Sequence, residues 1–252
     1  MRMPCTPDGV KSSMSQRNLH SRSGSYPAAV VWDLDGTIID SAPDLAAALN
    51  CLLEEHGKAP IYEANVRQMI GNGVAKLIQR GFAESGVIVG STELQSLQPR
   101  FMSIYTPRAS QLSELYPGAE SAIQAFHDSG VAQAICTNKP ESVSCEILSA
   151  MNLAQYFEFV VGGDSLEQRK PHPLPLQACL NALGTGVDST LMIGDSAVDA
   201  ETARAIGMTI GLVTHGYARQ PVETLGADFL ISNLATLPNE LGLREQNEQI
   251  AR

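Results

Sequence analysis

Residues 30–41 read VVWDLDGTIIDS. The segment begins as a short apolar run, which predicts a β-strand buried on both faces of a parallel sheet. It ends in two carboxylates, Asp33 and Asp35, and the following Gly36 is expected to break the strand. Both carboxylates then lie at the carboxyl end of a strand, where open parallel sheets bind their ligands. Because two acids this close repel each other unless a cation or a proton intervenes, the segment indicates either a functional site or an Asp-rich turn.

The pattern of apolar residues changes after Ser41. Side chains at helical spacing predict helices over about 45–53, 63–70, 74–84 and 92–106, with no strand pattern between residue 44 and about 113. A strong turn signal follows at Tyr116-Pro117-Gly118. Beyond it, helical patterns alternate with short apolar runs, which is typical of βαβ units and a parallel sheet. The expected helices cover about 119–129, 141–151, 174–183 and 199–206, and the expected strands about 131–136, 157–161, 190–193, 209–213 and 228–231.

We therefore expect an α/β protein with a Rossmann-like parallel-sheet core and an inserted α-helical cap domain. The core is predicted to take residues 27–43 and 114–240, and the cap residues 44–113. Residues 1–25 contain Ser and Arg but almost no acid and lack the apolar centre of a secretory signal, so we expect a disordered extension. An organelle transit peptide fits that composition weakly, whereas a start codon placed too early, with Met14 as one alternative, fits it equally well.

The composition limits what the chain can bind. Its 252 residues carry a formal net charge of −10 and are 44% hydrophobic, which indicates a substantial core and argues against a nucleic-acid or membrane-surface partner. No apolar run reaches the roughly 18 residues of a membrane span. The five cysteines are widely spaced and form no CxxC pair, which favours reduced thiols in a cytoplasmic protein. An anionic substrate would require a local positive field from a few Lys or Arg residues, helix N-termini or a metal.

Polar residues follow the predicted strands at four places. Taken singly, each has a structural explanation, since Thr137 and Asn138 suit a turn or a helix N-cap and Lys170 suits a solvated loop. Asp195 and Asp199 are four positions apart and would share one face of a helix. Their order and spacing, together with the first motif, favour a single shared site. The full set is Asp33, Asp35, Thr137, Asn138, Lys170, Asp195 and Asp199.

In that order, the four segments resemble the four motifs of the haloacid dehalogenase superfamily, whose first motif has the form DxDGT[LI]xDS. Within it, the likeness is strongest to the phosphoglycolate phosphatases, and it covers about 28–235. The strings that carry it are TNKP (137–140), GGDSLEQRKPHPLPL (162–176), IGDSAVD (193–199) and HGY (215–217). The resemblance implies a magnesium-dependent phosphate monoester hydrolase that acts through an aspartyl-phosphate. The implied reaction converts 2-phosphoglycolate to glycolate and phosphate.

The resemblance also implies roles for the acids. Asp33 would be the nucleophile and a ligand of Mg²⁺, and Asp195 would be a further ligand. Asp35 would offer its backbone carbonyl to the metal, while its side chain would serve as general acid and then as general base. Asp199 would orient metal-bound water or Lys170 rather than bind the metal itself.

Other residues would hold the substrate. Thr137 and Asn138 would bind the phosphoryl oxygens, and Lys170 would balance the charge of Asp33 and the phosphate. In the cap, Gly71-Asn72-Gly73 precedes a predicted helix, whose N–H groups suit an anion such as a carboxylate. A plain loop is the alternative there, and the similar GNG of phosphoglycolate phosphatases favours binding. Further cap cations would face either substrate or solvent: Arg67, Lys76, Arg80, Arg100 and Arg108.

Other functions are compatible with parts of this pattern. The chain could be a phosphatase for another small phosphorylated metabolite, such as a sugar phosphate or a nucleotide, or a phosphotransferase like β-phosphoglucomutase. A dehalogenase would need neither Asp35 nor the metal, and a phosphonate hydrolase would need a Schiff-base lysine in the cap. A non-catalytic binding protein on this fold would be expected to lack a catalytic residue. We expect a small phosphorylated metabolite as partner, no nucleic acid or membrane, and a monomer or homodimer.

Overall fold

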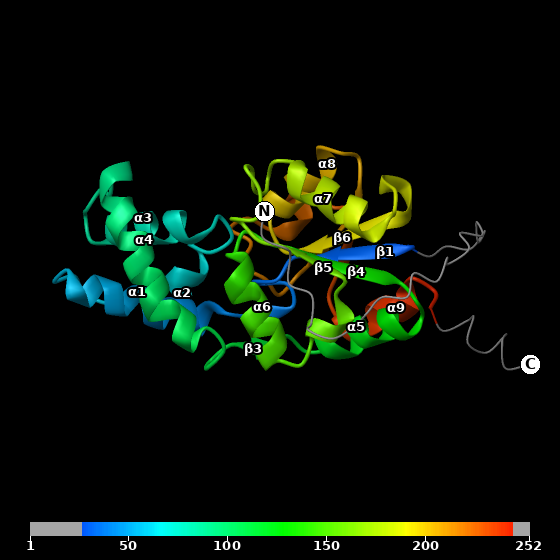
Figure 1. The fold of residues 1–252 in the computed structure, drawn as a ribbon, viewed down its shortest axis with the longest axis horizontal. Coiled ribbons are helices and arrows are strands. Elements are labelled where there is room, and N and C mark those ends of the chain that lie inside the picture. Colours follow the sequence, from blue (N-terminus) through cyan, green and yellow to red (C-terminus); the bar gives the residue numbers. More distant parts are fainter. Residues whose placement is uncertain (1–26, 244–252) are drawn as a thin grey trace, which may run out of the picture.

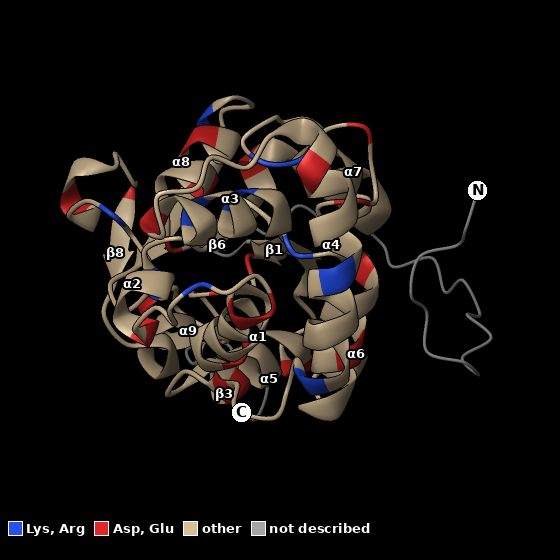
Figure 2. Ribbon diagram, turned by 90° about the vertical axis from the view of Figure 1, so that its left-hand side faces the viewer, with Lys and Arg blue, Asp and Glu red and all other residues tan. Residues whose placement is uncertain are grey.

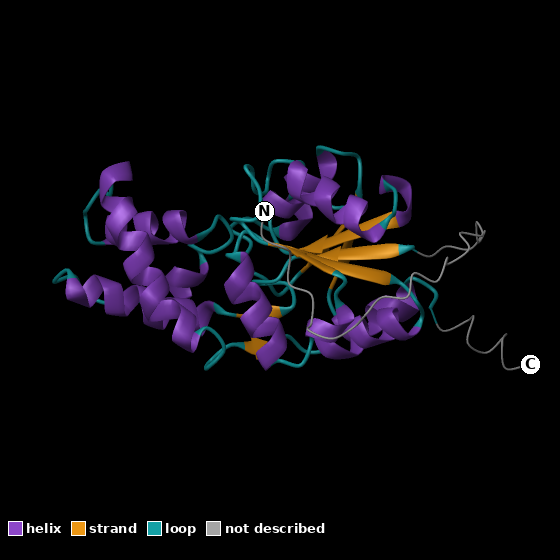
Figure 3. Ribbon diagram, viewed as in Figure 1, coloured by secondary structure: helices purple, strands orange, loops and turns teal. Residues whose placement is uncertain are grey.

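The computed structural model of the protein describes residues 27–243, so the extension predicted at 1–25 lies outside the described residues. Its main feature is a six-stranded sheet in the order β5-β4-β1-β6-β7-β8, in which all neighbouring strands are parallel (Figure 1, Figure 3). This sheet confirms the predicted α/β class. Its strands are β1 (Ala29–Trp32), β4 (Ala132–Cys136), β5 (Phe159–Val161), β6 (Thr190–Gly194), β7 (Thr209–Val213) and β8 (Phe229–Ile231).

Strand β1 lies in the middle of the sheet, with β4 on one side and β6 on the other. All of its side chains are fully buried because helices cover both faces of the sheet (Figure 1). Val30 and Trp32 pack in the layer that contains α5, α6 and α9, whereas Val31 packs in the layer of α7 and α8. Burial on both faces explains why the run is apolar throughout. These helices are α5 (Ala119–Asp128), α6 (Glu141–Ala150), α7 (Leu174–Leu183), α8 (Ala197–Arg204) and α9 (Leu237–Glu240).

Four further helices lie at one end of the molecule, away from the six-stranded sheet (Figure 1). They are α1 (Ala42–Glu55), α2 (Glu63–Arg67), α3 (Val74–Glu84) and α4 (Ser91–Tyr105). Fully buried Leu49, Ile78 and Phe101 join three of them in a common core. Helix α2 ends three residues before the predicted limit, because the chain turns at Ile70 into Gly71, whose φ of +101° is not helical. The exact boundaries of a cap and a core domain stay a prediction, and we call these four helices the cap.

The two chain segments that join the cap to the sheet pair with each other. Strand β2 (Ile39–Asp40) runs antiparallel to β3 (Glu114–Leu115), with Ile39 opposite Leu115. The sequence did not predict this small sheet, because two-residue strands are too short to show an alternating pattern. Next to it, the Asp44 carboxylate accepts hydrogen bonds from the N–H and hydroxyl of Ser113 at 2.8 and 2.7 Å. Entry to and exit from the cap are therefore held side by side.

Short 3₁₀ segments complete the fold, at η1 (Thr106–Arg108), η2 (Ala154–Tyr156), η3 (Val187–Ser189), η4 (Val222–Thr224) and η5 (Leu234–Thr236). Within residues 27–243, no helix combines the length and the apolar character needed to cross a membrane. Cys51, Cys136 and Cys179 are free thiols, as expected.

Candidate active site

Three neighbouring strands of the sheet, β4, β1 and β6, deliver polar residues to the same edge. Asp33 follows β1 directly, Thr137 follows β4 and Asp195 follows β6. The close approach of these segments depends on Gly36, whose φ is +87° and where any side chain would collide with the Asp195 carboxylate. The Asp195 carboxylate also accepts a 2.5 Å hydrogen bond from the N–H of Tyr217. The topology thus brings together residues from distant parts of the chain, as the sequence predicted.

Three buried carboxylates form a cluster at this edge. Oxygens of Asp33, Asp195 and Asp199 all lie within 4.8 Å of one another. Burial raises the pKa of Asp33 to about 7, an effect that Lys170 opposes and the neighbouring carboxylates reinforce. Burial and Asp199 likewise raise the pKa of Asp195 well above its ordinary value. Like charges this close need a cation to stay ionised together.

Lys170 supplies part of that positive charge. Its Nζ lies 2.9 Å from Asp33 Oδ1 and 2.6 Å from Asp199 Oδ1. Burial by itself would lower the pKa of Lys170, but Asp199 and Asp33 outweigh it and raise that pKa well above its usual range, so the side chain stays charged. Asp199 is held in turn by the Ser196 hydroxyl at 2.6 Å. The predicted association of Asp199 with Lys170 is therefore present in the structure.

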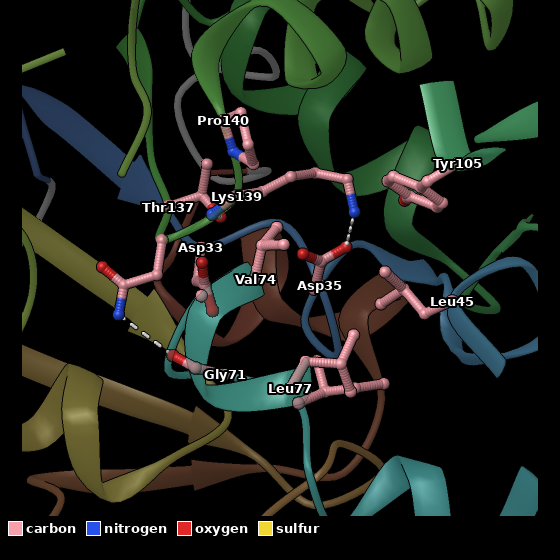
Figure 4. A pocket seen from close by; sticks show the side chains of 13 residues that line it. Asp33, Asp35, Leu45, Gly71, Val74, Leu77, Tyr105, Thr137, Lys139 and Pro140 are labelled. Atoms are coloured by element: carbon pink, nitrogen blue, oxygen red, sulfur yellow. Dashed lines mark hydrogen bonds and ion pairs between the residues drawn. The ribbon is translucent and has the colours of Figure 1, made fainter. Parts of the chain in front are cut away.

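Asp35 is not part of the three-acid cluster, and its carboxylate contacts two donors. Its Oδ1 accepts a hydrogen bond from Lys139 Nζ at 2.7 Å (Figure 4) and another from the Ser41 hydroxyl at 2.5 Å. Lys139 was not among the predicted site residues, although it belongs to the quoted TNKP string. Burial alone would lower the pKa of Lys139, but Asp35 raises it above its usual range, so Lys139 is a buried cation.

A pocket opens between these core residues and the cap (Figure 4). The core contributes the two acids of the first motif and the loop after β4, and the cap contributes an apolar wall with one tyrosine. The hydroxyl of that tyrosine, Tyr105, is buried, and apart from a contact with the Lys139 ammonium group it has no hydrogen-bond partner among the residues that the structure describes. Burial raises the pKa of Tyr105 to about 12. The lining residues are Asp33, Asp35, Leu45, Ile70, Gly71, Gly73, Val74, Leu77, Tyr105, Thr137, Asn138, Lys139 and Pro140.

The predicted Gly71-Asn72-Gly73 loop reaches this pocket, but its three residues are placed differently. Gly71 and Gly73 line the pocket, whereas Asn72 does not. The Asn72 Oδ1 instead accepts hydrogen bonds from Arg80 Nη2 at 2.8 Å and from Arg219 Nη2 at 2.9 Å. A substrate contact by Asn72 stays a prediction. The sequence did not predict that its side chain would bind the two arginines.

Asn138 joins the same cap loop to the core. Its Nδ2 donates to the carbonyls of Gly71 and Lys170, both at 3.0 Å. Thr137 and Asn138 both line the pocket as predicted, yet the amide N–H groups of Asn138 are already used by these carbonyls. The Thr137 Oγ1 accepts a hydrogen bond from the N–H of Lys139 at 3.2 Å, so its own proton is free to reach a bound oxygen.

Positive charge is otherwise dispersed. In the part of the chain that Figure 2 colours, lysines and arginines are scattered singly among acidic residues rather than gathered on one face. The positive field expected for an anionic substrate is therefore local, as the net charge implied, and comes from Lys139 and Lys170 beside the acids.

Comparisons with known proteins agree with this geometry. A family model described as haloacid dehalogenase-like hydrolase matches residues 30–213. The chain is 41% identical to a phosphoglycolate phosphatase of Rhodospirillum rubrum over 220 residues, covering 86% of this chain and 91% of that protein. It is 45% identical to a phosphoglycolate phosphatase of Cereibacter sphaeroides (strain ATCC 17029 / ATH 2.4.9) over 212 residues, covering 84% and 96%.

A solved structure is similar in three dimensions as well. The crystal structure of a predicted phosphoglycolate phosphatase from Haemophilus somnus matches with a TM-score of 0.81 and 28% sequence identity. The match covers 86% of this chain and 99% of that one. The likeness therefore includes both the sheet and the cap helices, since neither alone makes up that share of the chain.

Proposed function

The chain is a phosphatase that belongs to the haloacid dehalogenase-like hydrolase family, and we propose that it hydrolyses 2-phosphoglycolate to glycolate and phosphate through an aspartyl-phosphate, with Mg²⁺ as cofactor. The observation that carries the proposal is the buried Asp33 at the end of β1, paired with Lys170 at 2.9 Å and clustered with Asp195. The names of the relatives support the choice of substrate.

The acid cluster fits a hard divalent cation. Asp33 and Asp195 offer buried carboxylate oxygens, and Lys170 is the one Lys or Arg residue in ion-pair contact with the cluster among the described residues. Mg²⁺ prefers such oxygens and needs few of them from the protein. Asp33, Asp195 and the backbone carbonyl of Asp35 would hold it. When bound, Mg²⁺ would supply positive charge that lowers the repulsion between the carboxylates and the substrate phosphate.

In the first step, the Asp33 carboxylate attacks phosphorus, forming an oxygen–phosphorus bond as the bond to the ester oxygen breaks. Only the ionised carboxylate is a nucleophile, and nearby cations favour that form over the protonated one. The ion pair with Lys170 also fixes the direction of the carboxylate. Lys170 itself is held by Asp199, whose hydrogen bonds from the α8 N-terminus keep it in place.

Asp35 then completes the reaction. Its carboxyl group donates a proton to the departing ester oxygen and afterwards accepts one from the water that cleaves the aspartyl-phosphate. The hydrogen bonds from Lys139 and Ser41 hold Asp35 at the wall of the pocket. In the sequence, a single residue separates Asp35 from the nucleophile Asp33. Thr137, with its free hydroxyl proton, and backbone N–H groups would bind the phosphoryl oxygens.

A panel of small phosphate monoesters tests the proposal. We expect Mg²⁺-dependent phosphate release with the highest kcat/KM on 2-phosphoglycolate, compared with hexose phosphates, nucleotides and an aryl phosphate. A preference of tenfold or more for a hexose phosphate or a nucleotide would contradict the substrate but leave the mechanism in place. Burst kinetics of Asp35→Asn test the mechanism, since the burst should survive better on aryl than on alkyl esters, whose leaving group needs the proton. An equal loss of burst on both ester types would exclude the acid role.

A further inference from the structure

The pocket contains one cation to which the proposed chemistry assigns only a contact with Asp35. Among the lining residues, Lys139 is the one Lys or Arg, and its side chain is only 2% exposed. Its Nζ donates to Asp35 at 2.7 Å and lies 5.0 Å from the centre of the Tyr105 ring (Figure 4). An ammonium group has three N–H donors; within the described part of the chain one reaches Asp35 and the Tyr105 hydroxyl lies close enough to receive a second, which leaves at least one. Lys139 therefore has a donor left for a ligand.

Tyr105 presents a second unused donor beside it. It is the last residue of α4 in the cap and is fully buried, and apart from a contact with the Lys139 ammonium group its hydroxyl has no partner among residues 27–243, so its proton is unused. A buried donor without an acceptor costs about 1–3 kcal/mol, so such a group in a pocket points to a ligand. Lys139 from the core and Tyr105 from the cap meet only when the two parts are together.

The covalent structure of the substrate fixes where its charges lie. In 2-phosphoglycolate a single carbon separates the carboxylate from the ester oxygen that Asp35 would protonate. Lys139, which is hydrogen-bonded to Asp35, is therefore adjacent to the place that the substrate carboxylate must occupy. The remaining cap wall of Leu45, Val74 and Leu77 is apolar. A carboxylate entering there would lose its hydration without compensation unless a cation and a donor received it.

The Lys and Arg residues of the cap are not suited to bind the substrate carboxylate, because they are paired with other residues or lie outside the pocket lining. Arg67 pairs with Asp40 at 2.8 Å, and Arg100 pairs with Glu55. Arg80 donates to the carbonyl of Met69 and to Asn72. The N-terminus of α3 at Gly73 does line the pocket, but it provides only a partial charge.

From this placement, and resting on the proposed function, we propose that Lys139 and Tyr105 bind the substrate carboxylate and thereby select 2-phosphoglycolate over esters that lack one. Lys139 shares its ammonium group between Asp35 and the carboxylate, while the Tyr105 hydroxyl donates a hydrogen bond to the second carboxylate oxygen. The receptor is complete only when the cap lies against the core. Because Lys139 contacts both groups, binding of the substrate carboxylate also affects the position of the general acid, Asp35.

The test compares two substrates that differ only at the carboxylate: 2-phosphoglycolate and 2-hydroxyethyl phosphate. We expect Lys139→Met to reduce the ratio of their kcat/KM values by about tenfold or more, and Tyr105→Phe by about fivefold, in line with charge-assisted hydrogen bonds. Lys139→Met will slow both reactions because it also removes the hydrogen bond to Asp35. This effect is common to the two substrates, so it cancels in the ratio of their kcat/KM values. Tyr116→Phe is the matched control, since its hydroxyl is also buried and Tyr116 does not line the pocket.

Binding provides a second readout that does not require turnover. The inhibitor 3-phosphonopropionate, in which a methylene replaces the ester oxygen, should bind more tightly than propylphosphonate, and both variants should remove most of that difference. An unchanged substrate ratio and an unchanged inhibitor difference in both folded variants would overturn the receptor and leave Lys139 acting through Asp35 alone. A wild-type enzyme without a preference for 2-phosphoglycolate over 2-hydroxyethyl phosphate would instead contradict the proposed function, and the receptor with it.

Discussion

Arg219 donates a hydrogen bond of 2.9 Å to Asn72, which lies 147 positions earlier in the chain. The same guanidinium donates to the carbonyl of Gln68 at 2.6 Å and to that of Ile70 at 2.9 Å. One arginine that follows β7 therefore holds the whole turn before α3. Because Gly71 within that turn lines the pocket, a residue outside the pocket sets the position of its wall.

Arg219→Ala should loosen this wall. We expect KM for 2-phosphoglycolate to rise about tenfold, equivalent to the loss of one or two hydrogen bonds, with a smaller change for an aryl phosphate that does not fill the cap side. Steady-state kinetics on both substrates measure the effect. Arg204→Ala is the control, because Arg204 also binds backbone carbonyls, those of Leu225 and Gly226, away from the pocket lining. Equal KM changes in the two variants would contradict the interpretation.

Asp33→Asn should abolish turnover while the protein stays folded. The amide neither attacks phosphorus nor carries the negative charge of a metal ligand. In metal-free buffer the variant should unfold at a higher temperature than wild type, because one of three clustered buried carboxylates becomes neutral. Asp44→Asn should instead unfold at a lower temperature, since Asp44 accepts hydrogen bonds from Ser113 and lies outside the cluster. Substantial phosphatase activity in purified Asp33→Asn would exclude the nucleophile role.

Metal removal should switch off the wild-type enzyme reversibly. We expect exhaustive chelation to remove activity and added Mg²⁺ to restore it, while Ca²⁺ inhibits because its higher and looser coordination misplaces Asp33. Thermal unfolding gives an independent signal, since Mg²⁺ should raise the unfolding temperature of wild type far more than that of Asp33→Asn. Full activity after chelation would contradict a requirement for a metal ion.

Gly73→Ala should impair the use of 2-phosphoglycolate more than a general loss of stability explains. The residue has a φ of +82°, and a side chain there would approach Arg169 Nη1 at 3.0 Å and the Asn138 carbonyl at 3.3 Å. We expect kcat/KM for 2-phosphoglycolate to fall about tenfold and that for an aryl phosphate to fall less. Gly57→Ala is the matched control, with a φ of +66° and nothing within 4 Å of the added carbon. Both variants lose stability from the strained backbone, by about 1 kcal/mol, so equal losses of activity would exclude a specific role for Gly73.

The junction between cap and sheet should weaken in acid. Burial alone would raise the pKa of Asp40, but hydrogen bonds from Arg67 and Tyr217 outweigh it and hold that pKa below its usual range. Because the folded-state pKa is depressed, the stabilisation is present above the unfolded value near 4 and is lost as the pH falls below it. Asp40→Asn should cost about 1 kcal/mol at pH 7, discounted for the partial exposure of the pair, and progressively less as the pH falls through the depressed folded-state pKa.

Urea unfolding at a series of pH values measures this difference. Glu120→Gln, which changes an exposed acid of α5, should show no comparable pH dependence. A constant difference between wild type and Asp40→Asn from pH 7 to pH 3 would contradict the assignment.

Much of the fold could be predicted because its signals are local. The bounds of α3, α7 and β7 agree with the ranges predicted from apolar spacing. By contrast, β2 and β3 are each two residues long, and their pairing depends on a contact between distant segments. Apolar periodicity reports which face of an element is buried but not which short segments meet.

The site residues that were predicted have local sequence signals, whereas those that were missed depend on contacts between distant segments. Asp33 and Asp195 stand at strand ends, where topology alone brings them together. Lys139 acquires its place from a contact with Asp35, 104 positions away, and Arg219 from contacts with a cap turn. Lysine and arginine occur on most protein surfaces, so nothing in the sequence distinguishes a buried cation from a solvated one before the chain is folded.

The central position of β1 has a consequence for the order in which the protein is made. The cap helices find their partners within residues 42–105, so they can pack soon after they leave the ribosome. Strand β1 precedes them, yet its neighbours are β4 and β6, and the second of these ends at Gly194. Strand β1 therefore stays unpaired until β4 is made and keeps one open edge until β6 follows, and such apolar segments are prone to aggregate or to recruit chaperones. Any chain that terminates before β6 lacks Asp195 and Asp199, so we expect truncated products to be inactive.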